Sequence, residues 1–142
     1  MSESVLMQLE NAKNSQNPDD VEDAINAAWN GGMKREYLPI LLDLLRKTDH
    51  FRHEDIVNAL QELKDPDSID VLHETATKKY SYYISDSEFP LARKCIWALA
   101  DIGTPESKES LKLLSLHSNQ EVASYAKKRI SRWFVELGRK GI

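Results

Sequence analysis

The stretch ALQELKDPDS, residues 59–68, contains the end of one helix and the start of the next. Leu60 and Leu63 are three residues apart, which places both on one side of a helix. Asp65 is of a type that caps helix N-termini, and Pro66 suits a first helical turn, where its missing N–H is not needed. The stretch therefore predicts two helices joined by a short turn.

The same pattern returns in ALADIGTPES, residues 98–107, which lies 39 positions further along the chain. Other recurrences have a step of 31 residues, since Ile25 returns as Ile56 and Cys95 returns as Ala126. A recurrence at a fixed step of this length is typical of proteins built from stacked repeats. The difference of eight residues between the two steps indicates an inserted loop at about residues 80–88, which contain the non-periodic run YSYYISDS.

Helical periodicity divides the chain into segments that pair as four helix hairpins. The expected helices cover residues 3–13, 19–30, 35–47, 53–64, 67–79, 89–102, 106–117 and 120–137. A single hairpin exposes its apolar side, so neighbouring hairpins must stack to bury it. The sequence predicts an all-α fold in one domain, residues 1–142: a right-handed, curved α-solenoid of about four hairpins, with a long C-terminal capping helix over residues 120–137.

The composition agrees with a helical protein of single-domain size. The 142 residues include only five glycines and five prolines, and 41% are hydrophobic. The longest apolar runs are too short to cross a bilayer, and the first ten residues lack the positive charge of a signal peptide. We therefore expect a cytoplasmic protein, in which the single cysteine, Cys95, lies in the core. Trp29 and Trp133 are expected in the core and in the C-terminal cap, respectively.

The two motifs A-L-x-x-L-x-D-P-x-S at residues 59–68 and A-L-x-x-I-G-T-P-x-S at residues 98–107 resemble the HEAT-repeat family, including its short bacterial HEAT-like members. The resemblance covers about residues 19–137. It implies recognition of another protein along a surface lined by helices, and it does not imply an enzyme.

Histidines raise a different possibility. The dyads His53-Glu54 and His73-Glu74 resemble those of HEAT-like deoxyhypusine hydroxylases, in which repeated His-Glu dyads hold two irons. However, the positions 31 residues before and 39 residues after the first dyad hold no second dyad. His50 and His53 form a lone H-x-x-H pair, which is too few ligands for a metal site. We therefore expect no enzyme activity, no metal and no cofactor.

Charge is distributed unevenly along the chain. Residues 1–107 contain 11 Lys or Arg against 20 Asp or Glu, whereas residues 108–142 contain eight against three. The most acidic stretch, residues 49–74, argues against nucleic acid as a ligand, because phosphate binding needs clustered cations. Its carboxylates either form ordinary solvated helix faces or form a patch that attracts a basic protein.

A candidate partner surface follows from the helix at residues 53–64. The side opposite its apolar residues carries Asp55, Asn58 and Glu62. The repeat steps add Lys94, Trp97 and Asp101 in the next hairpin and Tyr125, Lys128 and Arg132 in the last. We expect these nine residues to line a groove that is acidic at one side and basic at the other, with Trp97 at its centre.

The inserted loop supplies aromatic residues close to Trp97 in sequence. Tyr80, Tyr82, Tyr83 and Phe89 have rings that suit recognition at low entropic cost. Either these rings fold back and pack against Trp97, or they contact a partner.

The leading hypothesis is a non-catalytic protein binder. Small acidic proteins of this kind resemble bacterial immunity proteins, which neutralise a toxin domain by covering its active site or another functional surface. A basic toxin domain would complement residues 49–74. The alternative is a general HEAT-like adaptor or assembly scaffold.

The variant Trp97→Ala together with Tyr82→Ala is expected to weaken partner binding while leaving helicity unchanged, because both rings belong to the predicted surface rather than the core. Binding titrations combined with circular dichroism test this expectation, and unaltered affinity in the double variant would remove these two rings from the site.

Overall fold

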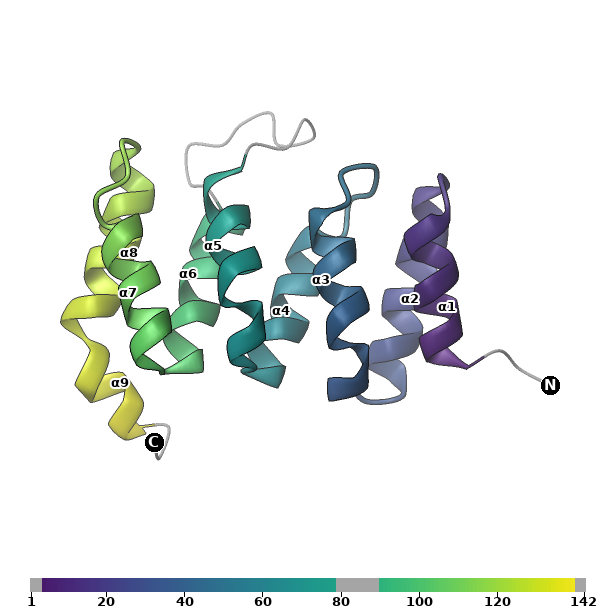
Figure 1. Cartoon of the computed structure of the whole chain (residues 1–142), viewed down its shortest axis with the longest axis horizontal. Coiled ribbons are helices and arrows are strands. Elements are labelled where there is room, and N and C mark those ends of the chain that lie inside the picture. Colours follow the sequence, from purple (N-terminus) through teal and green to yellow (C-terminus); the bar gives the residue numbers. More distant parts are fainter. Residues whose placement is uncertain (1–3, 79–89, 140–142) are drawn as a thin grey trace. The chain divides into compact units, whose positions relative to one another are not determined.

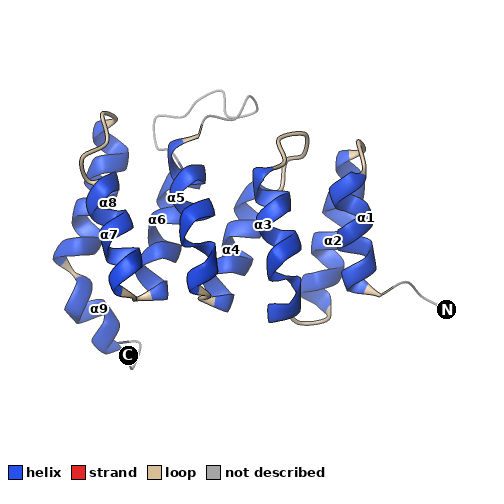
Figure 2. Cartoon of the chain, viewed as in Figure 1, coloured by secondary structure: helices blue, strands red, loops and turns tan. Residues whose placement is uncertain are grey.

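The computed structural model describes residues 4–78 and 90–139, and within these residues the regular structure is entirely helical (Figures 1 and 2). The predicted all-α class is therefore confirmed. The backbone contacts divide the chain into two compact units, unit 1 (Met1–Leu63) and unit 2 (Lys64–Ile142). Residues 80–88, predicted as an inserted loop, lie outside the described residues.

Unit 1 consists of two helix hairpins. Its elements are α1 (Val5–Asn14), α2 (Pro18–Asn30), the 3-10 helix η1 (Arg35–Tyr37), α3 (Leu38–Arg46) and α4 (His53–Leu63). Helix α1 packs against α2 and α3 packs against α4, while α1 also contacts α3 and so joins the two hairpins. In Figure 1, α1 and α3 form the nearer layer of this unit and α2 and α4 the farther layer.

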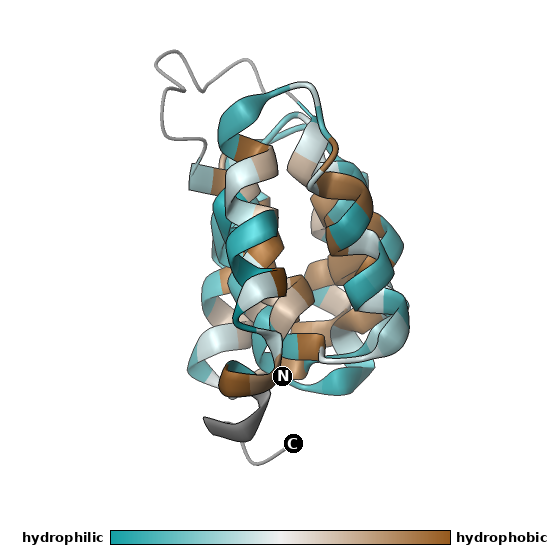
Figure 3. Cartoon of the chain, turned by 90° about the vertical axis from the view of Figure 1, so that its left-hand side faces the viewer, coloured by the Kyte–Doolittle hydropathy of each residue, from teal (hydrophilic) through white to brown (hydrophobic). Residues whose placement is uncertain are grey.

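Unit 2 consists of two further hairpins and a short last helix. Its elements are η2 (Pro66–Ser68), α5 (Ile69–Thr77), α6 (Pro90–Ile102), α7 (Pro105–Leu114), α8 (Gln120–Ser131) and α9 (Trp133–Arg139). Helix α5 packs against α6, and α7 packs against α8. Helix α6 also contacts both α7 and α8, so it is the central helix of the unit. Seen from the side in Figure 3, hydrophobic residues concentrate where the helices of the two layers face each other.

The two motifs end one helix and start the next by similar means. Asp65 accepts a hydrogen bond from the backbone N–H of Asp67 at 2.8 Å, and η2 starts at the following proline. In the second motif Thr104 and Ser107 form a reciprocal capping box at the start of α7. Gly103 has a φ of 71°, a left-handed conformation that favours glycine. The predicted short turns are therefore confirmed.

The repeat positions share one environment. Ile25, Ile56, Cys95 and Ala126 are all fully buried, although they come from four different helices. Burial also raises the pKa of the Cys95 thiol, so this residue stays a neutral core side chain near neutral pH. The recurrence therefore identifies core positions in both units.

The prediction of one long capping helix over residues 120–137 is wrong. Helix α8 ends at Ser131, and α9 begins at Trp133 after Arg132, whose backbone leaves the helical conformation. The break allows Arg129 and Glu136 to form an ion pair with a distance of 2.5 Å. In a continuous helix, residues seven positions apart are separated by about 10 Å along the axis.

None of the helices within the described residues is long and apolar enough to cross a membrane.

Leu60→Ala is expected to lower the free energy of unfolding by about 2 to 5 kcal/mol, because the leucine is fully buried and its truncation leaves a cavity. Urea denaturation measures the change. The matched control is Leu116→Ala, since Leu116 is 80% exposed and its truncation should change stability by less than about 0.5 kcal/mol. Equal effects of the two substitutions would show that Leu60 does not belong to the core.

Candidate partner-binding site

The predicted partner-binding residues fall into three groups. Asp55, Asn58 and Glu62 lie on α4 in unit 1, whereas Lys94, Trp97 and Asp101 lie on α6 in unit 2. Tyr80, Tyr82 and Tyr83 lie outside the described residues.

The α4 residues form a polar stripe that Arg52 connects to α2. Asp55 and Asn58 are partly exposed and Glu62 is exposed. The Arg52 guanidinium pairs with the Asp55 carboxylate at 3.0 Å through Nη1 and donates to Asn26 Oδ1 of α2 at 2.7 Å through Nη2. This bridge holds α2 and the start of α4 together and leaves the outer side of both helices polar.

Helix α2 extends this stripe with one further carboxylate, an asparagine and one aromatic ring. Asp23 and Trp29 lie one turn before and one turn after Asn26, and all three are exposed. The prediction that Trp29 belongs to the core is wrong. Trp29 is 36% exposed, although Leu60, its repeat equivalent, and Ala28, its neighbour in the chain, are fully buried.

We call this surface the acidic face of unit 1. It is made up of residues from α2 and α4: Asp23, Asn26, Trp29, Asp55, Asn58 and Glu62.

In unit 2, Trp97 is stacked by an arginine that the repeat pattern did not indicate. The Arg129 guanidinium carbon lies 3.7 Å from the centroid of the Trp97 ring, which is close enough for a cation–π interaction. The indole is 37% exposed, so part of its surface stays accessible. Lys94, one turn before Trp97, is partly exposed. The accessible part of the ring therefore lies in a cationic setting.

A buried carboxylate fixes Arg129 in this position. Glu136 Oε1 accepts from Arg129 Nη1 at 2.5 Å and from Arg132 Nε at 3.3 Å. The side chains of Arg129 and Glu136 are both almost fully buried. Such a pair contributes little net stability relative to apolar packing. However, moving either side chain away would leave the other as an unpaired buried charge, which restricts the conformation of both. The arginine is therefore held over the tryptophan.

Asp101 does not belong to the predicted surface. Its side chain is only 8% exposed, and every residue from Ala98 to Ile102 is buried. The reason is that α6 contacts α5, α7 and α8, so the second half of this central helix has no open side. On α8, Lys128 is exposed and Tyr125 is partly exposed, and Arg132, which follows α8, is partly exposed.

Sequence reasoning missed Arg129 and Glu136. The step of 31 residues made Lys128, and not Arg129, the repeat equivalent of Trp97. The spacing of Arg132 and Glu136, four residues apart, was a readable sign of an ion pair. The Arg129 pair depends on the break between α8 and α9, for which no glycine or proline gave a signal.

His50 and His53 act as caps of α3 and not as an open ligand pair. Both are fully buried, and their rings stack with centroids 4.1 Å apart. The Nε2–H of His50 donates to the Leu44 carbonyl, and that of His53 donates to the Lys47 carbonyl, both at 2.7 Å. The Nδ1 atom of His50 accepts from the Arg52 N–H at 3.0 Å. The Leu44 carbonyl also accepts from the Lys47 N–H at 3.2 Å, so the two histidine bonds add to the backbone bonds that end α3.

His73 belongs to a separate polar contact in unit 2. Its Nδ1 atom lies 2.7 Å from Ser110 Oγ, so the pair joins α5 to α7. Burial lowers the pKa of His73, the nearby Asp70 opposes this effect, and His117 adds to it. Within the described residues, no three His, Cys, Asp or Glu side chains are grouped as a metal site would require.

No protein-family model, no curated protein and no solved structure matches this chain. The surface features that remain as candidates for binding are the acidic face of unit 1 and the exposed ring of Trp97 in unit 2.

The free energy of unfolding is expected to fall as the pH decreases below about 6.5. Burial lowers the pKa of His50 from its usual value of 6.5. Below that value the unfolded chain binds a proton that the folded chain does not bind, which favours unfolding. Urea denaturation at several pH values between about 7.5 and 5.5 measures the effect.

The variant His50→Gln provides the comparison. It should be less stable than the wild type at pH 7.5, because it loses the Nε2–H bond to Leu44, and its stability should depend less on pH. Identical pH profiles for the two proteins would contradict a neutral, buried His50.

Proposed function

We propose that this protein is a non-catalytic, immunity-type inhibitor that binds a basic toxin domain and neutralises it by covering a functional surface. The observation that carries the proposal is the acidic face of unit 1, which combines carboxylates of α2 and α4 with the exposed ring of Trp29. Carboxylates on such a face attract a cationic partner during diffusion and select against acidic proteins.

Trp29 gives this face a candidate anchor. Tryptophan is among the residues most enriched at interface hot spots, because its large ring loses much water on binding at low entropic cost. Its 36% exposure leaves part of the indole free for contact. Asn26, one turn before Trp29, and Asn58 of α4 supply amide groups for directional hydrogen bonds on the same acidic face.

The proposal includes a HEAT-like architecture for the whole chain. Each unit contains two contacting hairpins, so four hairpins that continue in one direction would form a right-handed α-solenoid. Lys94 and Trp97 would give the partner a further contact within unit 2. The inserted tyrosines, Tyr80, Tyr82 and Tyr83, lie outside the described residues.

A general adaptor is the second candidate. One observation favours it: unit 2 exposes several large apolar side chains on α7 and α9, and an adaptor needs more than one binding surface.

Charge reversal by Asp55→Lys with Glu62→Lys is expected to weaken binding at least about tenfold, because like charges would then face a basic partner. The partner is first captured from native cells with the tagged wild-type chain and identified by mass spectrometry. Its affinity for each variant is then measured by calorimetry.

The matched control is Glu10→Lys with Glu36→Lys, which changes the net charge equally. Glu10 lies on α1 and Glu36 on η1, which contact each other. In Figure 1, α1 belongs to the nearer layer of unit 1, whereas α2 and α4 form the farther layer. The control should bind as the wild type does. An acidic partner, or equal loss of affinity in both double variants, would contradict the proposed site.

A further inference from the structure

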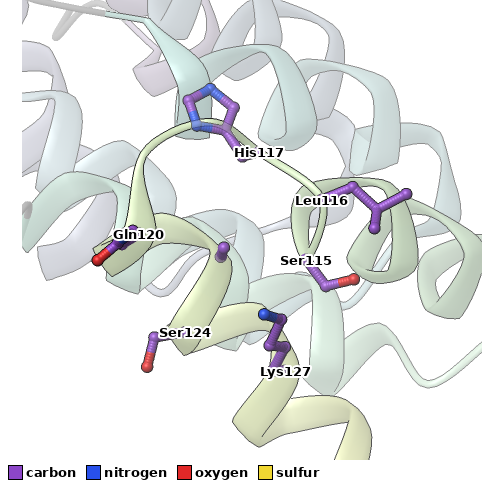
Figure 4. Close-up of a pocket in the computed structure, with 7 residues that line it drawn as sticks. Ser115, Leu116, His117, Gln120, Ser124 and Lys127 are labelled. Atoms are coloured by element: carbon purple, nitrogen blue, oxygen red, sulfur yellow. The ribbon is translucent and has the colours of Figure 1, made fainter.

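A second surface lies on the last hairpin of unit 2. A pocket of about 530 Å³ lies between the turn that joins α7 to α8 and the first turns of α8. Figure 4 shows its labelled side chains around the turn that joins the two helices. They are Ser115, Leu116, His117, Gln120, Ser124 and Lys127, and Ala123 completes the lining.

Exposed apolar side chains adjoin this pocket. Leu116 is 80% exposed and Leu113 is 63% exposed, and the Leu116 N–H donates to the Leu113 carbonyl, so both belong to one turn. A third exposed side chain, Phe134 of α9, is 81% exposed and lies at the other end of α7, beside Lys108. Exposed apolar groups gathered on one side of a protein are typical of an interaction site.

Lysines accompany these apolar groups. The Lys108 ammonium lies 5.1 Å from the centroid of the Phe134 ring, which places Phe134 beside the first turns of α7. Lys112 follows one turn later on α7 and pairs with Glu109 at 3.1 Å. Lys127 is exposed and lines the pocket from α8. Cations therefore accompany the apolar residues from Phe134 to Leu116.

We propose that this surface binds an amphipathic helix of a second protein, whose apolar stripe is flanked by carboxylates. We call it the α7–α8 surface and define it by two kinds of residue. Its apolar residues are Leu113, Leu116 and Phe134, and its cations are Lys108, Lys112 and Lys127.

The dimensions of the surface suit a helix. Lys108, which lies against Phe134, and Leu116, two residues beyond the end of α7, are eight residues apart, which corresponds to about 12 Å at the rise of a helix. A partner helix places its i and i+7 side chains about 10 Å apart on one side. One such helix lying along α7 can therefore contact Phe134 with one end of its apolar stripe and Leu116 with the other.

The lysines of the α7–α8 surface favour an acidic partner over a second copy of the chain. Two copies of the chain that met through this same surface would bring lysines against lysines, which opposes self-association. Nucleic acid would match the lysines but would leave Leu113, Leu116 and Phe134 without apolar contacts. An acidic amphipathic helix matches both the lysines and the apolar groups.

The probe for this proposal is a synthetic fluorescein-labelled peptide of about 18 residues, with leucines at helical i, i+3, i+4 and i+7 spacing and glutamates on both flanks. A second peptide has lysine in place of every glutamate. Fluorescence anisotropy with the full chain should show saturable binding of the glutamate peptide and at least about tenfold weaker binding of the lysine peptide.

Two protein variants locate the binding. Leu113→Ser with Leu116→Ser should weaken binding of the glutamate peptide at least about tenfold, because both anchors are lost. The matched control Leu6→Ser with Met7→Ser changes exposed apolar residues of unit 1 and should leave the affinity unchanged. Asp55→Lys with Glu62→Lys should also bind this peptide as the wild type does, so the test is independent of the acidic face.

Several results would overturn the proposal. These are no binding of the glutamate peptide, equal binding of both peptides, or an affinity unaffected by the two serine substitutions. Self-association of the wild-type chain that Leu116→Ser abolishes, measured by analytical ultracentrifugation, would identify a second copy as the occupant. Tighter binding of a duplex RNA, lost in Lys127→Glu, would identify nucleic acid instead.

Discussion

The structure depends on the burial of one apolar side of every helix hairpin against a neighbouring hairpin of its unit. In unit 1 this contact is made by α1 with α3, and in unit 2 by α6 with α7 and α8. Small side chains permit close approach, and Ala28, Ala59 and Ala98 are all fully buried at equivalent positions of the repeat. Because a single hairpin cannot bury its apolar side alone, each unit needs both of its hairpins.

The same constraint determines which residues remain for recognition. In unit 1, α2 and α4 use their apolar sides for packing and leave Asp23, Asn26 and Asp55 outside, where Arg52 connects the two helices. In unit 2, α6 is so enclosed that only its first turns reach the surface, which leaves Trp97 as its exposed aromatic residue. The polar outer residues are therefore available for binding without a cost to the core.

Much of the fold was predictable because it follows from local spacing. The capping residues and prolines of the two motifs predicted the short turns, and the step of 31 residues identified Ile25, Ile56, Cys95 and Ala126 as core. These signals are local or repeated, so one sequence is enough to read them.

The candidate site was less predictable because exposure depends on which helices surround a residue. Asp101 is the repeat equivalent of the exposed Glu62, yet it is buried because three helices enclose the end of α6. Similarly, the role of His50 depends on a carbonyl six residues earlier, at the end of α3, and Arg129 reaches Glu136 only after a break in the helix. Such contacts follow from the tertiary fold and leave no pattern at a fixed spacing.

The most direct test of the central claim is hydrogen–deuterium exchange of the chain, free and in complex with the protein it captures. If the acidic face is the binding surface, the amides of α2 and α4 around Asn26 and Asn58 will exchange more slowly in the complex. Unchanged exchange throughout α2 and α4 in a saturated complex would contradict the account.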